Sequence, residues 1–269
     1  MTETRIEQPR PSALQALLEL PRAGMRELWG LWSLLLRTLY FIPRGKREEG
    51  AVVREMYSMG NRSIFFMTVT MGFIGAIIVF QSGVQAKKLI PDMSMLGAMY
   101  IKLLVRDLAA SVGAMPLATR VGAGIAAEIG SMVVTEQVDA LRMNAADPVD
   151  YLVKPMFIAS VIMGTVVLLW SAAVALLVGM VTANIVFDVN YHTFLNFSMV
   201  TTSDAVLGLI KAVTYGAAIA IVSAHQGLTT HGGSEGVGWA TTRAVVGSSF
   251  AIIVLNLIIS SAGHFLLPA

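Results

Sequence analysis

The chain has 269 residues, of which 55% are hydrophobic and only 13% are charged, and its formal net charge is +2. Roughly a quarter of the residues of a soluble domain are charged, and a disordered chain has a low share of apolar residues. The composition therefore excludes both classes. The chain has no cysteine, which excludes disulfides and thiolate metal sites, and its four histidines lack metal-ligand spacing.

The first 62 residues form a basic, amphipathic start. They hold ten of the nineteen basic residues, interleaved with seven acids and an apolar run from Leu28 to Leu36. This mixture argues against a nucleic-acid-binding arm and against a cleaved signal peptide. We predict a cytoplasmic segment, 1–62, with an amphipathic helix over about residues 12–41 lying in the inner interface, anchored by Trp29 and Trp32. A sixth span is the alternative, but the uncharged run is too short to cross.

Five later stretches approach or exceed the roughly 20 apolar residues that a span requires. The sequence therefore predicts an all-α polytopic membrane domain over residues 63–269. Its spans lie at about 63–86, 94–127, 155–187, 205–230 and 244–267. Charges inside the second and fourth spans should face protein, water or an interface, because burial in hydrocarbon is costly. These charges are Lys102, Arg106, Asp107, Arg120 and Lys211.

Basic residues also predict the orientation. Their excess before the first span places the N-terminus in the cytoplasm, and five spans then place the C-terminus on the opposite side of the membrane. The connections 128–154 and 231–243 become cytoplasmic, and they contain Arg142, Lys154 and Arg243.

Small residues recur at every fourth position of the second span: Ala110, Ala114, Ala118, Gly122, Ala126 and Gly130. Such a stripe lets another helix approach closely in lipid. The alternative is that alanine and glycine are simply common in this chain. We interpret the stripe as a helix-packing surface.

The connection after the second span predicts two short cytoplasmic helices. Thr135 is a suitable N-cap for the first, with Glu136 in its first turn, and Asp147 with Pro148 begins the second. On the first helix Val138, Leu141 and Ala145 share an apolar face. The result is a short amphipathic rod suited to docking into a partner's groove, or else an ordinary solvated connection.

Two segments resemble the MlaE/YrbE family of ABC-transporter permeases: ATRVGAGIAAEIGSMVVTEQVDALRMNAADPVDYLVKP, from Ala118 to Pro155, and ATTRAVVGSS, from Ala240 to Ser249. The order of a basic start followed by five spans also resembles this family along the whole chain. The resemblance implies a homodimer, a separate cytoplasmic ATPase that binds ATP and Mg²⁺, and an MCE-domain protein at the outer face of a bacterial inner membrane. It also implies phospholipid transport between the inner and outer membranes of a Gram-negative envelope.

The resemblance further implies roles for particular residues. The ATPase-coupling helix corresponds to Thr135, Glu136, Gln137, Val138, Asp139, Leu141 and Arg142. The polar lining of a central lipid cavity corresponds to Arg106, Asp107 and Lys211, for which a purely internal ion network is the alternative. Family members commonly have Glu-Leu-Gly-Pro after the arginine, where this chain has Asp107-Leu-Ala-Ala and no proline. We predict that Phe73, Ile77 and Phe80 form the apolar lining of this cavity.

The chain shows no catalytic apparatus. The glycines from Gly232 to Gly238 lack the lysine of a phosphate-binding loop, so ATP hydrolysis is expected in a separate subunit, and no cofactor or metal is expected on this chain. A proton-driven secondary transporter is one alternative, but it predicts internal repeats that the sequence does not show. A non-transporting membrane scaffold for an MCE protein is another.

Overall fold

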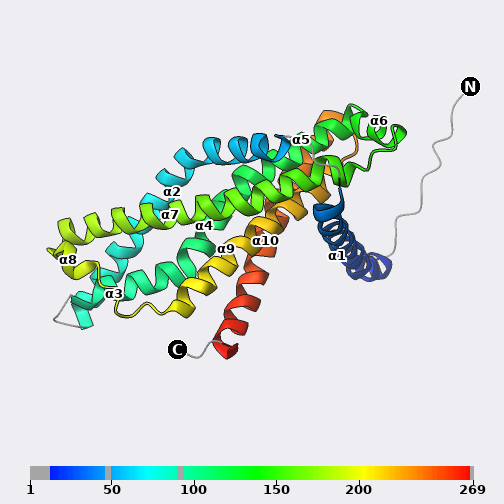
Figure 1. The fold of residues 1–269 in the computed structure, drawn as a ribbon. Helices are drawn as coiled ribbons and strands as arrows, with labels where there is room; N and C mark the ends of the chain where they lie inside the picture. Colours follow the sequence, from blue (N-terminus) through cyan, green and yellow to red (C-terminus); the bar gives the residue numbers. More distant parts are fainter. Residues whose placement is uncertain (1–12, 46–49, 90–93, 267–269) are drawn as a thin grey trace, which may run out of the picture.

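The computed structural model describes residues 13–45, 50–89 and 94–266, with side chains described for 24–45, 50–88 and 95–266. Every regular element in these ranges is helical, which confirms the predicted all-α class (Figure 1). Residue 12 of the predicted interfacial helix and the basic residues Arg5, Arg10, Lys46 and Arg47 lie outside the described residues.

Helix α1 (Ala13–Arg44) lies at one end of the molecule and runs at an angle to the long helices (Figure 1). Leu31, Leu34 and Leu35 pack towards the bundle core, whereas Trp29 and Trp32 are exposed. The sequence placed Leu31 and Leu35 on the same apolar face as the tryptophans, but they contact the bundle instead. The helix is thus apolar on two sides, one covering protein and the other open to its surroundings.

Five helices or helix runs are long and apolar enough to cross a membrane, as predicted. The first is α2 (Ala51–Leu89). The second is built from α3 (Ser94–Leu103), η1 (Leu104–Leu108), α4 (Ala109–Leu117), η2 (Ala118–Gly122) and α5 (Ala123–Val134). The third joins η3 (Val149–Val153) to α7 (Lys154–Phe187), and the last two are α9 (Thr202–Leu228) and α10 (Gly233–Leu266). Helix α2 begins well before residue 63, so Arg54, Glu55 and Arg62 lie on the helix itself.

The second span is continuous but contains two π-helical turns, η1 and η2. Such turns insert an extra residue into an α-helix and occur frequently at functional sites. Pro116 lies between them inside α4. The backbone irregularity of this span is therefore concentrated around Arg106, Asp107 and Arg120.

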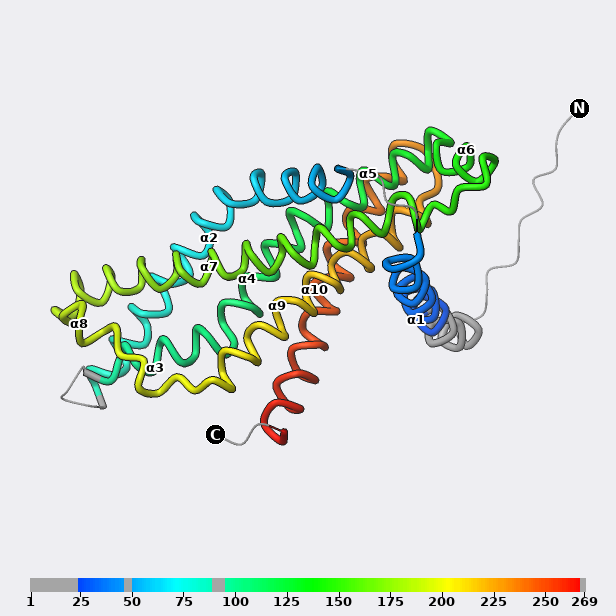
Figure 2. Tube along the Cα trace, in the orientation of Figure 1, coloured from blue at the N-terminus to red at the C-terminus, as the bar shows by residue number. Residues whose placement is uncertain are grey.

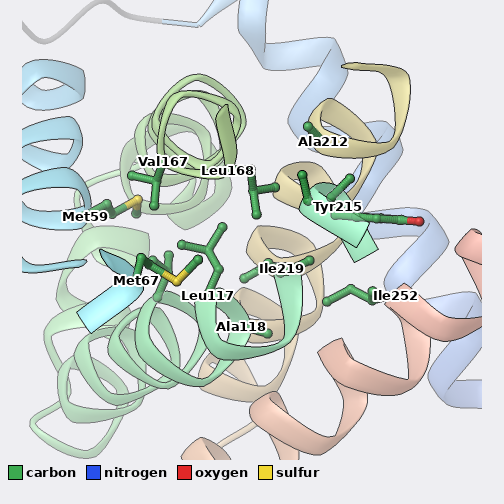
Figure 3. Packing of buried hydrophobic residues seen from close by; sticks show 14 of the residues in the cluster. Met59, Met67, Leu117, Ala118, Val167, Leu168, Ala212, Tyr215, Ile219 and Ile252 are labelled. Carbon is green, nitrogen blue, oxygen red and sulfur yellow. The ribbon is translucent and has the colours of Figure 1, made fainter. Parts of the chain in front are cut away.

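The long helices pack as two neighbouring pairs, α2 with α7 and α9 with α10, and the second span contacts both (Figure 2). Buried side chains from all five spans meet between them, including Met67, Leu117, Val167, Tyr215 and Ile252 (Figure 3). At Gly216 helices α7 and α9 nearly touch, since an added Cβ would lie 2.8 Å from the carbonyl oxygen of Ser160. The core is thus a close-packed interior between helices, with an apolar outer surface.

Two short helices mark the ends of the bundle. Helix α6 (Gln137–Met143) lies at the same end as α1, whereas α8 (Tyr191–Phe194) lies at the opposite end, near the start of α3 (Figure 1). The connection between the second and third spans therefore shares a side with α1, in agreement with the predicted topology.

Candidate functional site

Two ion pairs join the second span to α9. Arg106 Nη1 donates to Asp204 Oδ1 over 2.9 Å, and Lys211 Nζ donates to Asp107 Oδ1 over 2.5 Å. The side chains of Asp204 and Lys211 are only 1% and 2% exposed, so each needs its partner to remain charged. Arg106 and Asp107 are adjacent in the π turn η1. They thus form ion pairs with an acceptor and a donor on the same neighbouring helix, α9.

Hydroxyl and amide groups extend these pairs to α10. Lys211 Nζ also donates to Ser260 Oγ over 2.8 Å, and Ser260 Oγ donates to Asn256 Oδ1 over 3.2 Å. Tyr215 OH donates to the same Asn256 oxygen over 3.1 Å. Asp107 additionally accepts a hydrogen bond of 2.8 Å from Ser111 Oγ. We call this set the ion network; its members are Arg106, Asp107, Ser111, Asp204, Lys211, Tyr215, Asn256 and Ser260.

Asp204 is held by the first turn of its own helix. Its Oδ2 accepts hydrogen bonds from the Thr201 amide and hydroxyl, at 3.1 Å and 2.9 Å, and its amide donates to Thr201 Oγ1, which makes a capping box. The other carboxylate oxygen accepts from Arg106. The sequence analysis missed Asp204, although Thr201-x-x-Asp204 at the start of a span was a readable capping signal.

The ion network is open on one side. The side chains of Arg106 and Asp107 keep 33% and 37% of their surface exposed, in contrast to their partners. The predicted pairing of Asp107 with a cation is present, with Lys211 as that cation. Arg106 therefore presents part of a guanidinium, a group suited to bidentate binding of phosphate oxygens.

An apolar groove of about 150 Å³ lies between the second span, α7 and α9, and shares no lining residue with the ion network. Its walls come from η1, α4, α7 and α9 and include Val105, Leu168, Leu169 and Leu209. Helix α9 lies against η1 here because Gly208 has no side chain: a Cβ would sit 2.2 Å from the Val105 carbonyl oxygen. The sequence alone did not indicate this groove, in which Val105 and Ala205 directly adjoin Arg106 and Asp204 in the chain.

The predicted apolar lining lies elsewhere. Phe73, Ile77 and Phe80 are exposed on α2, which packs mainly against α7, whereas the ion network joins the second span, α9 and α10. Within one chain the structure therefore does not bring these three side chains to Arg106, Asp107 and Lys211. Hydrophobic periodicity identified an outward face of α2 but not the helix opposite it.

The cytoplasmic connection differs from its prediction in detail. Thr135 is not an N-cap: its hydroxyl donates to Ser131 O at the end of α5, and α6 begins only at Gln137. Glu136 adopts a left-handed conformation with φ of 60°, which turns the chain between the helices. Ala145, also left-handed with φ of 55°, lies beyond α6 and is not on its apolar face. The second predicted helix begins after Asp147 as expected, but it runs directly into the third span.

Helix α6 presents a mostly polar surface. Val138 is buried and Leu141 half-buried, whereas Glu136, Gln137, Asp139 and Arg142 are exposed. Arg142 Nη1 donates to Asp139 Oδ1 over 2.9 Å along the outer face. Val138 thus fixes the helix to its own chain, and the exposed side chains remain available to a partner.

The six residues of the small-residue stripe are all buried: Ala110, Ala114, Ala118, Gly122, Ala126 and Gly130. A Cβ on Gly122 would lie 2.9 Å from Ser223 Oγ, and one on Gly130 would lie 2.9 Å from Thr230 Oγ1. Ser223 lies on α9 and Thr230 lies two residues after its end, so this part of the stripe faces α9. Within the described ranges no group of three or more His, Asp or Glu side chains is arranged to hold a metal ion.

Comparison with known proteins gives concordant matches. A family model described as "Permease MlaE" matches residues 52–262. A Synechocystis protein named as a probable ABC transporter permease is 34% identical over 249 residues, covering 88% of this chain and 94% of the relative. A Rickettsia bellii protein with the same description is 33% identical over 235 residues, covering 87% of each chain. The Arabidopsis thaliana protein TRIGALACTOSYLDIACYLGLYCEROL 1, chloroplastic, is 31% identical over 226 residues, covering 82% of this chain and 63% of the relative.

Proposed function

This chain belongs to the MlaE permease family, and from that membership we propose that it is the multi-pass membrane subunit of an ABC transporter for phospholipids. In the proposed assembly two copies bind a cytoplasmic ATPase, which holds ATP and Mg²⁺, and an MCE-domain protein on the outer face of the inner membrane. The complex moves phospholipid between the inner and outer membranes. The N-terminus is cytoplasmic and the C-terminus periplasmic.

The observation that carries the proposal is the partly exposed guanidinium of Arg106 on the turn η1, whose neighbouring residue Val105 lines an apolar groove. A phospholipid combines a phosphate with apolar chains, so its site needs a cation next to an apolar wall. Asp204 and Asp107 hold the two cations in position and limit how tightly a phosphate is bound. In support, the Arabidopsis relative is named for a diacylglycerol glycolipid.

Homodimer formation is supported by α10, which is the least buried of the five spanning helices. Its large exposed side chains include Trp239, Val246, Phe250, Leu257 and Phe265. The same helix carries Asn256 and Ser260 of the ion network on its inner side. A second copy lying against α10 would enclose the open side of the network between two chains.

Coupling to the ATPase is assigned to the exposed surface of α6. The helix is short, is fixed to its own chain by Val138, and is separated from α5 by two residues and from η3 by five. A force applied to it would therefore reach the second and third spans through short connections.

Two variants test the role of Arg106. Arg106→Ala removes the cation, whereas Asp204→Asn breaks the same ion pair but leaves the cation and keeps an oxygen for the Thr201 cap. With the ATPase and MCE partners in proteoliposomes, Arg106→Ala should reduce ATP-dependent lipid transfer at least tenfold, and Asp204→Asn should reduce it much less.

The paired charges also favour a second candidate role, in which the ion network only fastens α9 and α10 to the second span. That role predicts equal losses from both variants, in proportion to the loss of assembled complex. Equal transfer defects with a matching fall in complex recovery would therefore reject lipid binding at Arg106.

A further inference from the structure

A second polar site lies at the opposite end of the bundle from the ion network. Two adjoining hollows, of about 130 Å³ and 370 Å³, share Glu55 and Glu128 as walls and together form what we call the inner cleft. The smaller hollow is lined by charged and hydroxyl groups of α2, η2 and α5: Glu55, Ser58, Arg62, Ser63, Arg120 and Glu128. These residues play no part in the ion network.

The inner cleft lies at the depth of lipid headgroups. Helix α2 has 39 residues, so it is roughly 58 Å long, against a hydrocarbon core of about 30 Å. Its uncharged run begins at Ser63. Glu55 and Arg62 therefore precede the hydrocarbon, and in the proposed orientation they lie in the inner leaflet's polar layer.

A buried hydroxyl points to a ligand. Ser63 is 1% exposed, and its Oγ makes no hydrogen bond with any described residue. A buried hydroxyl without a hydrogen-bond partner costs free energy. Most buried serines inside a helix would donate a hydrogen bond to a backbone carbonyl of the preceding turn. Ser63 lines the same hollow as two arginines, so it is placed to bind an oxygen-rich group there.

The inner cleft holds charges of both signs, few of which pair. Among the described residues, Arg62, Arg120 and Glu128 form no ion pair, Glu55 lies 3.9 Å from the exposed Arg54, and Glu55 and Glu128 are near enough to repel one another. Opposite charges that line one cleft without pairing leave room for a ligand that carries both charges. Guanidinium groups bind phosphate, and carboxylates accept hydrogen bonds from an ammonium.

From this arrangement we propose that the inner cleft binds the headgroup of a zwitterionic aminophospholipid, of the phosphatidylethanolamine class, from the inner leaflet. The phosphate lies between Arg62 and Arg120, within reach of Ser63, and the ammonium lies at Glu55 and Glu128. The acyl chains follow the exposed apolar face of α2 beyond Ser63, where Phe65 and Val69 lie. This inference rests on the proposed orientation, but it requires neither transport nor lipid at the ion network.

Native mass spectrometry of the purified assembly tests the headgroup assignment. With equal phosphatidylethanolamine and phosphatidylglycerol in the detergent, the wild type should retain phosphatidylethanolamine preferentially. The double variant E55Q/E128Q should lower its retention about tenfold relative to phosphatidylglycerol, and R62Q/R120Q should lower both. The matched control K87Q/K88Q, which removes two cations from the other end of α2, should change neither. Unchanged preference in E55Q/E128Q would overturn the proposal, and so would loss of the ATPase without loss of lipid, which would make the cleft a protein-docking surface.

Two further measurements use the wild type and so do not depend on variant folding. A photoreactive phosphatidylethanolamine with its reactive group near the phosphate should label the α2 segment 51–63. Labelling confined to α9 and α10 would assign all retained lipid to the ion network and overturn this site while leaving the proposed function intact. Tail-less glycerophosphoethanolamine should compete weakly, since the acyl chains contribute to binding; full competition would reject a lipid as the ligand.

Discussion

Arg37 of α1 donates a hydrogen bond of 2.8 Å to Asp147, whose other carboxylate oxygen accepts from the Val149 amide at the start of η3. One carboxylate thus begins the third span and joins it to α1. The side chains are 57% and 30% exposed, so the ion pair alone contributes little.

Substitutions at these two positions should separate the helix start from the ion pair. Asp147→Ala removes both interactions and should destabilise the protein by about 1–2 kcal/mol, whereas Arg37→Ala should cost about 0.5 kcal/mol. Asp147→Asn, which keeps an acceptor for the Val149 amide, should resemble Arg37→Ala. Unfolding midpoints in detergent would check this order; equal effects of Asp147→Ala and Asp147→Asn would contradict it.

Lys211 and Asp107 should show strong thermodynamic coupling. Lys211→Met leaves Asp107 without its cation and should cost about 2–3 kcal/mol, less than a fully buried pair because Asp107 is 37% exposed. Adding Asp107→Asn should recover a large part of that loss. A double-mutant cycle measures the coupling, and additive effects would mean that the two groups do not interact in the protein.

Gly208 should tolerate no side chain. Gly208→Ala places a Cβ against the Val105 carbonyl oxygen and should cost about 1–3 kcal/mol as α9 is pushed away from η1. Gly238 is the matched control, because an added Cβ there meets nothing within 4 Å. Gly238→Ala should be neutral or stabilising by up to about 1 kcal/mol, since alanine favours a helix. A neutral Gly208→Ala would show that the helices separate at no cost.

The exposed face of α6 should determine ATPase binding. Leu141→Glu adds a charge to a half-buried position and should reduce recovery of the ATPase in a pull-down at least tenfold, with the chain still in the membrane. Glu136→Gly is a comparison variant that keeps the backbone turn before α6, because glycine readily adopts the left-handed conformation of Glu136. Retained ATPase in Leu141→Glu would remove α6 from the proposed coupling surface.

The fold was more predictable from the sequence than the site. Uncharged runs of span length identified three of the five spanning helices, because a bilayer requires such runs, and long apolar stretches interrupted by charges identified the second and fourth. Asp107 of the second span and Lys211 of the fourth do meet inside the protein. Helix ends were less readable: Thr135 has the side chain of an N-cap, but its hydroxyl bonds back to Ser131 instead.

The sequence did not indicate which residues contact each other across the bundle. Asp204 directly precedes the predicted fourth span, but nothing in one-dimensional spacing paired it with Arg106. Phe73, Ile77 and Phe80 were predicted to line the cavity with the charged groups, yet within one chain they are exposed on α2, which packs mainly against α7 and not against the ion network. Periodicity gives the face of a helix, whereas the neighbour of that face is decided by packing.

The π-helical turns of the second span also determine how its two ends are rotated relative to each other about the helix axis. Every fourth position advances about 40° beyond a full turn of an α-helix, so a long four-residue repeat drifts around the axis. The stripe from Ala110 to Gly130 nevertheless remains buried, because the extra residue of the turn at 118–122 offsets part of this drift. Deleting one residue there would rotate Asp107 relative to Glu128 by about 100°. The angular relation between the ion network and the inner cleft is therefore encoded in a residue count.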